Sequence, residues 1–313
     1  YDTCCGLPPN SDCSDDCYED EAGECCLEED VDDCDVCNGD NDCIANILIV
    51  DQSGTGDFTT IQEAVTNAVS SDVIIVNPGI YNEQILISNK ENLIIKSNYE
   101  ENSSAIDQTI IDGSGLIDTP LIIINNLTGT SIIEGFTVRG ANNPNEDGGA
   151  MHISNSELHL ERLLIIDNNA EFGAGLYVES SDLSLNHITI SDNNSSDGII
   201  PSGSGIYFAN GSNLEVENSI IWGNNGYQIV SHYESSPVNN FELNYSNIEL
   251  NSWDLPYCAF CEDNFESILY NDPNFEDSEY GNYHLSFPSS CIDYGLDFDL
   301  DGTASDLGCF TFE

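Results

Sequence analysis

Acidic side chains at alternating positions near the carboxyl terminus give the clearest chemical signal in this chain of 313 residues. The segment Asp297-Phe-Asp299-Leu-Asp301-Gly302 has the alternating carboxylates and the glycine that open a calcium-binding loop. The twelfth position of such a loop is Gly308 here and not a bidentate glutamate, so we predict Asp306 as the substitute ligand. A solvated acidic turn that closes the last part of the fold explains the same residues equally well.

A second oxygen-rich cluster lies in the amino-terminal segment and contains Asp32, Asp33, Asp35, Asp40 and Asp42. Carboxylate oxygens are the ligands that calcium prefers. A chain with 57 acidic and 4 basic side chains also needs counter-cations to reduce its self-repulsion. We therefore predict that calcium stabilises the protein, with Asp33, Asp35 and Asp40 as ligands here, although a solvated acidic segment again accounts for the same residues.

The thirteen cysteines indicate an oxidising compartment. Nine of them lie within residues 1–43, and this odd number leaves at least one thiol without a partner inside the segment. The pairs Cys34-x-x-Cys37 and Cys258-x-x-Cys261 have the spacing of zinc ligands, but they are more than two hundred residues apart. Disulfides are therefore the favoured interpretation. The simplest of three possible pairings near the carboxyl terminus joins Cys258 to Cys261 and Cys291 to Cys309.

The formal net charge of -53 limits the classes of partner and substrate. A polyanion of this density repels nucleic acid and anionic membrane surfaces. Lyases and esterases of acidic polysaccharides use Arg, Lys or a metal ion to neutralise carboxylates and developing anions. The chain offers only four basic side chains, Lys90, Lys96, Arg139 and Arg162. Glycosidase chemistry needs only two carboxylates about 5–10 Å apart, but no pair stands out, so we assign no catalytic residue.

An internal repeat in the middle of the chain indicates its fold. Asn-Asn pairs begin at residues 142, 168, 193 and 224, at intervals of 26, 25 and 31 residues. Each interval holds short apolar segments separated by turn residues, such as Gly175-Leu-Tyr-Val178 and Gly205-Ile-Tyr-Phe208. A repeat of roughly 20–50 residues built from short strands indicates a solenoid. Because each unit has room for about three strands and for no helix, the sequence predicts a parallel β-helix.

Alternation within the strands assigns side chains to faces. Met151, Leu176 and Ile206 are predicted to stack inward, so their neighbours His152, Tyr177 and Tyr207 stack outward on one face. Such a row of aromatic side chains is a candidate ligand site, which could follow a sugar chain or dock against a protein. The alternative is that these residues occupy positions where β-propensity favours aromatic side chains.

The Asn-Asn pairs are predicted to be structural. Asn tolerates the left-handed conformation of tight turns, and stacked side-chain amides can hydrogen-bond from coil to coil. When the repeats are aligned on these pairs, Ile188 and Ile190 fall one residue out of phase with Leu164 and Ile166. The alignment therefore predicts a turn that absorbs one residue.

A helix is predicted before the first coils. Thr60 and Glu63 form a capping box, and Ile61, Ala64, Val65, Ala68 and Val69 have helical spacing. The open end of a β-helix exposes core side chains and unpaired strand edges. We expect this helix to cover that end.

Three segments match known families. Residues 54–65 followed by Val73-Ile-Ile-Val-Asn-Pro-Gly79-Ile-Tyr81-Asn-Glu83 resemble the first coil of pectin-lyase-like right-handed β-helix proteins, especially the Gly-x-Tyr-x-Glu motif of pectin methylesterases. Residues 283–293 and 299–308 are similar to the closing segment of secreted bacterial β-helix repeat proteins. Residues 32–41 resemble Cys- and Asp-rich repeats of bacterial surface proteins. The later methylesterase motifs are absent, so the resemblance implies the fold and not the activity.

Together, these observations predict an all-β protein, a right-handed parallel β-helix with a short amino-terminal capping helix and a disulfide-rich amino-terminal module. We expect a Cys- and Asp-rich module at 1–44, the β-helix at 45–257 and a disulfide-closed segment at 258–313. No apolar run approaches the roughly 18–20 residues that span a bilayer.

Because the chain begins at Tyr1 without Met, we expect a mature secreted product in the extracellular space or at the cell surface. Our main functional prediction is a calcium-stabilised structural or adhesive protein of the cell surface or matrix that self-associates into fibres through its amino-terminal arm. The alternative is a carbohydrate-active enzyme or a polysaccharide-binding module.

Overall fold

The computed structural model of the chain describes residues 45–98, 106–116, 118–195, 203–232, 238–250, 262–299 and 302–312, together with two short strands nearer the amino terminus. The chain divides into two compact units, residues 1–46 and 47–313. In the first unit, β1 (Cys17–Glu19) and β2 (Cys25–Leu27) pair antiparallel. The predicted ligands and cysteines at positions 33, 34, 35, 37 and 40 lie outside the described residues.

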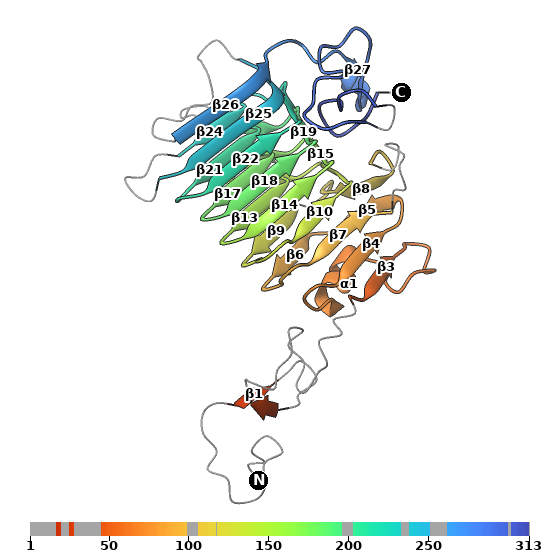
Figure 1. Ribbon diagram of the computed structural model, residues 1–313. Helices are drawn as coiled ribbons and strands as arrows, with labels where there is room; N and C mark the ends of the chain where they lie inside the picture. Colours follow the sequence, from red (N-terminus) through yellow and green to blue (C-terminus); the bar gives the residue numbers. More distant parts are fainter. Residues whose placement is uncertain are drawn as a thin grey trace, which may run out of the picture. The chain divides into compact units, whose positions relative to one another are not determined.

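The second unit is a right-handed parallel β-helix whose strands stack in three columns (Figure 1). We name each column after one of its strands. The β13 face contains β6 (Ile85–Ser88), β9 (Ile122–Asn125), β13 (Met151–Ser154), β17 (Leu176–Glu179), β21 (Ile206–Ala209) and β24 (Ile229–Ser231). The β14 face contains β3 (Ile47–Val50), β4 (Val73–Val76), β7 (Ile94–Ser97), β10 (Ile132–Glu134), β14 (Glu157–Glu161), β18 (Asp182–Asn186) and β22 (Asn213–Glu217).

The third column, the β15 face, contains β5 (Gly79–Tyr81), β8 (Thr109–Asp112), β11 (Thr137–Arg139), β15 (Leu164–Ile166), β19 (Thr189–Ser191) and β23 (Ile220–Trp222). The long strand β25 (Asn240–Ile248) pairs with both β22 and β23, so it joins the β14 and β15 faces. β26 (Glu262–Leu269) pairs with β25. Three two-residue strands, β12 (Asn142–Asn143), β16 (Asn169–Ala170) and β20 (Asn194–Ser195), pair where the β15 face turns toward the β13 face.

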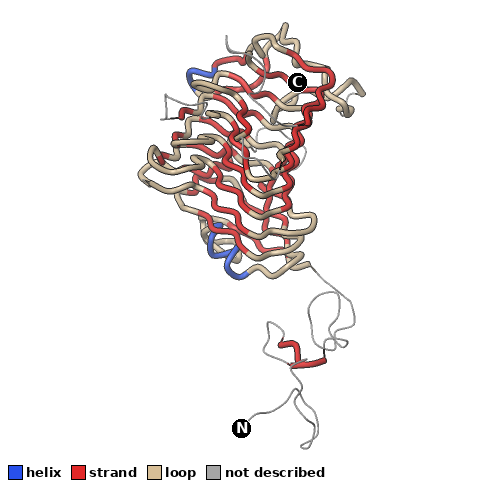
Figure 2. Tube along the Cα trace, turned by 90° about the vertical axis from the view of Figure 1, so that its left-hand side faces the viewer, coloured by secondary structure: helices blue, strands red, loops and turns tan. Residues whose placement is uncertain are grey.

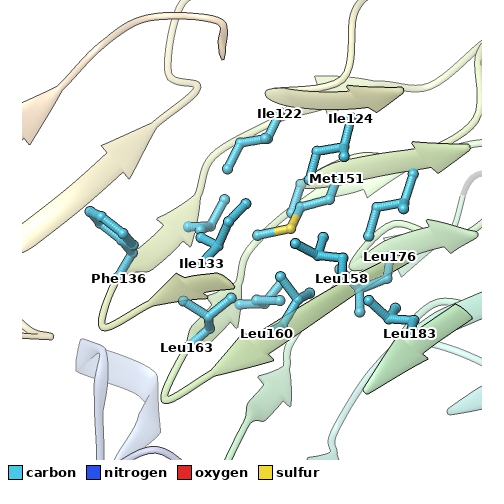
Figure 3. Close-up of a cluster of buried hydrophobic side chains, with 14 of the residues drawn as sticks. Ile122, Ile124, Ile133, Phe136, Met151, Leu158, Leu160, Leu163, Leu176 and Leu183 are labelled. Carbon is cyan, nitrogen blue, oxygen red and sulfur yellow. The ribbon is translucent and has the colours of Figure 1, made fainter. Parts of the chain in front are cut away.

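The core lies between the columns, where the alternating apolar side chains point inward. Met151 pairs in register with Leu176, which pairs with Ile206, as the sequence predicts. Figure 3 shows Ile122, Ile124, Met151 and Leu176 from the β13 face beside Leu158, Leu160 and Leu183 from the β14 face. All of these side chains are buried, so one continuous apolar core holds the coils together.

A glycine stands directly before β17 and before β21 on the β13 face, and it allows close approach of neighbouring coils. A Cβ added to Gly175 would lie 2.4 Å from the carbonyl oxygen of Gly205, and one added to Gly205 would lie 2.4 Å from that of Gln228. Any side chain at these positions would therefore push the coils apart, which explains why the repeat places glycine there.

Helix α1 (Ile61–Asn67) lies at the amino-terminal end of the solenoid, beside β3, β4 and β6 (Figures 1 and 2). Thr60 caps it by accepting a hydrogen bond from the backbone N–H of Glu63, at 3.2 Å. Ile61, Ala64 and Val65 are buried against the first coils. The predicted capping helix is thus confirmed, although it ends before Val69, whose side chain is 36% exposed.

The Gly-x-Tyr-x-Glu motif also serves this end of the fold. The carboxylate of Glu83 accepts hydrogen bonds from the backbone N–H groups of Ile61 and Gln62, both at 2.9 Å. These N–H groups belong to the first turn of α1 and have no partner within the helix. Tyr81 is buried, and its hydroxyl donates to the carbonyl oxygen of Asn77 at 2.8 Å. In this chain, the motif therefore joins the capping helix to the first coil.

The Asn-Asn pairs form two hydrogen-bonded ladders, as predicted. In the inner ladder, the amide of Asn168 donates to Asn193 at 3.0 Å, and that of Asn193 donates to Asn224 at 2.9 Å. The outer ladder joins Asn225, Asn194, Asn169 and Asn142 by amide–amide bonds of 2.5, 2.8 and 3.1 Å. Asn142 is therefore in register with the second residue of the later pairs, and Ala141 takes the inner position.

The predicted turn that absorbs one residue between the repeats is wrong. Leu164 pairs directly with Thr189, and Ile165 pairs with Ile190, so no turn absorbs a residue. Leu164 and Ile166 point outward instead, where they are buried in a cluster with Tyr283, Cys309 and Phe310. The carboxyl-terminal segment covers this part of the β15 face, so the outward-pointing residues there are apolar too. Apolar residues on both sides of the strand make the inward positions hard to recognise from the sequence.

The carboxyl-terminal segment contains β27 (Phe275–Asp277), the 3-10 helix η3 (Ser278–Tyr280) and β28 (Asn282–Leu285). The disulfide that we predicted between Cys291 and Cys309 stays a prediction: both side chains are buried in the structure, and no bond joins them there. They lie in different apolar clusters: Cys309 packs with Leu164 and Ile166, and Cys291 packs with Ile220 and Leu307. Cys258 and Cys261 lie outside the described residues.

Candidate functional site

The predicted aromatic row exists on the β13 face. His152, Tyr177 and Tyr207 are in register on successive strands. The ring centroids of His152 and Tyr177 are 4.8 Å apart, and those of Tyr177 and Tyr207 are 5.4 Å apart with nearly parallel planes at 8°. The row continues to His232, whose Nδ1 forms a hydrogen bond with the Tyr207 hydroxyl group.

The rings in this row cover each other's faces. Tyr207 is only 6% exposed and packs with Val230, Phe172 and Tyr227 in a small apolar cluster. A sugar ring needs an open aromatic face on which to lie, and the parallel stacking of Tyr177 on Tyr207 removes those faces. The binding role of the row stays a prediction, and its geometry favours packing.

Acidic side chains border the row at its amino-terminal end. The Glu179 carboxylate lies 3.5 Å from Nε2 of His152. Burial raises the pKa of the nearby Asp147 carboxyl group, and the negative charge of Glu171 raises it further. This end of the row therefore attracts protons or cations and repels anions.

The predicted carboxyl-terminal calcium ligands are only partly described. Asp306 is 2% exposed, and its carboxylate accepts hydrogen bonds from the backbone N–H groups of Asp293 and Phe312. Its own N–H donates to the Asp299 carboxylate at 3.3 Å. Asp297 is described as well, whereas Asp301 lies outside the described residues. Among the residues that the structure describes, no three His, Cys, Asp or Glu side chains gather to hold a metal ion. Calcium binding stays a prediction.

A groove of about 860 Å³ runs along the outer surface of the β14 face. It crosses β14, β18, β22, β25 and β26, so it follows the axis of the solenoid over successive coils. The inward-pointing residues Leu158, Leu183 and Leu214 supply its floor through their backbone. Its volume lies in the range of about 300–1,000 Å³ that is typical of ligand sites.

Two rows of polar side chains line this groove, and each row repeats once per coil. The first row contains Glu157, Asp182, Asn213 and Asn240. The second row contains His159, Ser184, Glu215, Glu242 and Asn264. Because strands in a parallel stack are about 4.8 Å apart, each row presents a hydrogen-bonding group at regular spacing.

Hydrogen bonds between coils fix part of the first row. The amide of Asn213 donates to the Asp182 carboxylate, and the amide of Asn240 donates to the side-chain oxygen of Asn213. These side chains are exposed to solvent but held in place by their neighbours. The groove therefore presents ordered acceptors before any ligand arrives, which lowers the entropy lost on binding.

The electrostatics of the groove are dominated by carboxylates. Among the described residues, four acidic side chains and one imidazole line it, and no Lys or Arg does. Just beside it, burial raises the pKa of the Glu217 carboxyl group, with a further contribution from Glu215. Burial likewise raises the pKa of Glu161, followed by the charge of Glu134 on the adjacent strand. An anionic ligand would meet repulsion here, while hydroxyl groups and cations would find acceptors.

We did not predict this groove, although the sequence contains a repeated pattern that indicates it. The four segments at 157–161, 182–186, 213–217 and 240–244 share one pattern, in which polar residues alternate with two inward apolar residues. Stacking these segments by register places their polar positions in continuous rows. We predicted a ligand site on the β13 face instead, because its aromatic residues repeat from coil to coil.

No protein-family model matches the chain. Among curated proteins, the probable pectinesterase/pectinesterase inhibitor 17 of Arabidopsis thaliana is 32% identical over 104 residues, which is 33% of this chain. The chain spans only 19% of the length of that relative.

Solved structures with a similar arrangement include pectin-acting enzymes. The pectin methylesterase from carrot gives a TM-score of 0.40 at 14% identity and covers 72% of this chain and 83% of that one. A pectin methylesterase mutant in complex with a hexasaccharide gives 0.40 at 16% identity, over 66% of both chains. A pectate lyase gives 0.36 at 12% identity, over 86% of this chain and 96% of that one.

The chain resembles pectin-lyase-like β-helix proteins. This resemblance confirms the one carried by residues 54–83. It also corrects our main functional prediction: the curated relative is a pectinesterase, and not a structural or adhesive protein. In the part of the chain that the structure describes, we find no helix long and apolar enough to cross a membrane.

Proposed function

We propose that this β-helix is a secreted carbohydrate-active protein that binds a polysaccharide along the groove of the β14 face. One observation carries the proposal: the groove presents the same hydrogen-bonding positions on successive coils, in two ordered rows. A linear polymer of similar units is the ligand that matches a linear surface of similar units. The naming of the curated relative as a pectinesterase supports a polysaccharide as that polymer.

The chemistry of the two rows suits sugar hydroxyl groups. Carboxylates such as Glu215 and Glu242 accept hydrogen bonds from hydroxyls, and these charge-assisted bonds are the stronger ones. Amides such as Asn213 both donate and accept, so they suit the donor and acceptor character of a hydroxyl group. Many such contacts, each worth only about 0.5–1.5 kcal/mol net, add up along a chain that spans several coils.

The groove is a better candidate than the aromatic row because its side chains are free to meet a ligand. Glu157, Asp182, Glu215 and Glu242 are all exposed, whereas Tyr207 is 6% exposed and Tyr177 is stacked on it.

Binding can be measured by affinity electrophoresis in gels that contain a series of polysaccharides, with methyl-esterified pectin included because of the curated relative. The groove variant carries Glu215→Ala and Glu242→Ala. The control variant carries Glu91→Ala and Glu279→Ala, which remove the same charge at exposed positions outside the groove.

We expect at least one polysaccharide to retard the native chain and the control variant equally, and to retard the groove variant at least tenfold more weakly. Retardation by none of the polymers, or equal retardation of both variants, contradicts the proposal. Reducing sugar or methanol released from a retained polymer would extend the function to catalysis.

A further inference from the structure

A second cavity lies at the β15 face and shares no residue with the groove of the β14 face. It has a volume of about 350 Å³ and sits between the ends of β19 and β23 and the segment 272–278 of the carboxyl-terminal region. The side chains that matter for its chemistry are Trp222, Phe275, Asp192, Asp272, Ser191 and Ser278. We infer that this cavity binds a single uncharged sugar residue.

The aromatic part of the cavity is fixed by packing. Trp222 ends β23 and packs partly buried against an apolar cluster that also includes Phe275. Phe275 makes an edge contact with Tyr283, with ring centroids 5.2 Å apart and planes at 73°. Unlike the rings on the β13 face, Trp222 has no aromatic ring stacked on it among the described residues. Its indole can therefore face the apolar C–H surface of a sugar.

The two carboxylates are also held in place. Asp192 accepts a hydrogen bond from the Tyr283 hydroxyl at 2.6 Å and another from the Ser191 hydroxyl at 3.2 Å. Asp272 accepts one from the backbone N–H of Asn274 at 2.8 Å. A carboxylate has about four acceptor positions, so each keeps some for a ligand. Two oriented acceptors with the Ser278 hydroxyl nearby complement the hydroxyl groups of a sugar.

The charge of the cavity determines which sugars fit. In the part of the chain that the structure describes, no Lys, Arg or His lines it, and its two titratable side chains are both acidic. A uronic acid would bring a third carboxylate into the same space, where the like charges would repel one another. An uncharged hexose keeps every hydroxyl contact without this repulsion. The inference does not depend on the groove, because the two sites share no residue.

Trp222 also provides the probe for a test. The chain contains two tryptophans, so Trp253→Phe leaves Trp222 as the only indole. Its fluorescence would be titrated with glucose, galactose, galacturonic acid and glucosamine. Asp272→Asn and Ser278→Ala are the site variants. Tyr280→Ala is the control, because Tyr280 is 86% exposed in the same short helix and does not line the cavity.

We expect a saturable fluorescence change with glucose or galactose, about tenfold weaker binding in Asp272→Asn, a smaller loss in Ser278→Ala, and no change in Tyr280→Ala. Galacturonic acid should bind at least tenfold more weakly than galactose, its uncharged counterpart. The inference is overturned if no neutral hexose gives saturation, if both site variants bind as the parent does, or if glucosamine binds tenfold more tightly than glucose, which would mark a cation site. The titration would also be repeated in the Glu215→Ala, Glu242→Ala variant. Unchanged hexose binding there shows that the cavity acts independently of the groove.

Discussion

The inner asparagine ladder should contribute far more to stability than the outer one, and the adjacent residues Asn193 and Asn194 allow a direct comparison. Asn193 is fully buried. Its side-chain oxygen accepts from the backbone and side-chain N–H groups of Asn168 at 3.1 and 3.0 Å. Its amide donates to Ile165, Ser191 and Asn224 at 2.9, 3.0 and 2.9 Å.

The expected cost of Asn193→Ala follows from these contacts. Each buried hydrogen bond contributes about 0.5–1.5 kcal/mol net, and a buried group left without a partner costs about 1–3 kcal/mol. Removing the side chain breaks five bonds and leaves the backbone N–H of Asn168 without an acceptor. We therefore expect the free energy of unfolding to fall by about 3–5 kcal/mol.

Asn194→Ala is the matched control. Asn194 is half-buried, and its side chain makes two amide–amide bonds, to Asn169 at 2.8 Å and from Asn225 at 2.5 Å. Water can replace both, so we expect a loss of about 1 kcal/mol or less. Urea unfolding followed by circular dichroism gives both values, provided that the slope with denaturant is the same for each variant. Losses that agree within about 0.5 kcal/mol would refute the division into a structural inner ladder and a minor outer one.

Four further outcomes follow from the structure. Glu83→Ala should lower the free energy of unfolding by about 2–4 kcal/mol, because two helix N–H groups lose the carboxylate that accepts their hydrogen bonds. The control Glu63→Ala should change it by less than about 1 kcal/mol. Equal effects of the two substitutions in urea unfolding would contradict the capping role of Glu83. The raised carboxyl pKa values of Glu161 and Glu217 mean that their stabilisation is complete below the unfolded value of 4.5 and is lost as pH rises through the folded value. The thermal midpoint should therefore rise as pH falls from about 7 to 5, and a fall on acidification would count against these pKa directions. Burial raises the pKa of the Cys309 thiol to about 12. A thiol reagent should therefore leave Cys309 unmodified in the native protein and modify it after unfolding, as measured by mass spectrometry. Rapid modification of Cys309 in the native protein would disprove its burial. Chelation of calcium should lower the thermal midpoint, and an unchanged midpoint would remove the calcium prediction.

The fold could be predicted from the sequence because its signals are local and repeated. The period of the Asn-Asn pairs, the inward alternation at Met151 and Leu176, and the capping box at Thr60 each follow from a few neighbouring residues. Stacking of identical coils then turns a local pattern into a whole architecture.

What the sequence could not show depends on contacts between distant segments. Leu164 and Ile166 are apolar because residues near Tyr283 cover them, and this packing led to the wrong prediction of a turn that absorbs one residue. Cys291 and Cys309 are close in sequence, and the sequence does not show that the chain places them in separate clusters. The groove was missed for a related reason, since its rows form only when strands from successive coils lie in register.

Carboxyl footprinting tests the central claim, that the groove of the β14 face binds a polysaccharide, most directly. The protein would be labelled with a carbodiimide and an amine, with and without the polymer that retards it most strongly, and the modified residues would be counted by mass spectrometry. We predict that the polymer lowers labelling of Glu157, Glu215 and Glu242 several-fold and leaves labelling of Glu279 unchanged. Unchanged labelling of the groove carboxylates in the presence of bound polymer would contradict it.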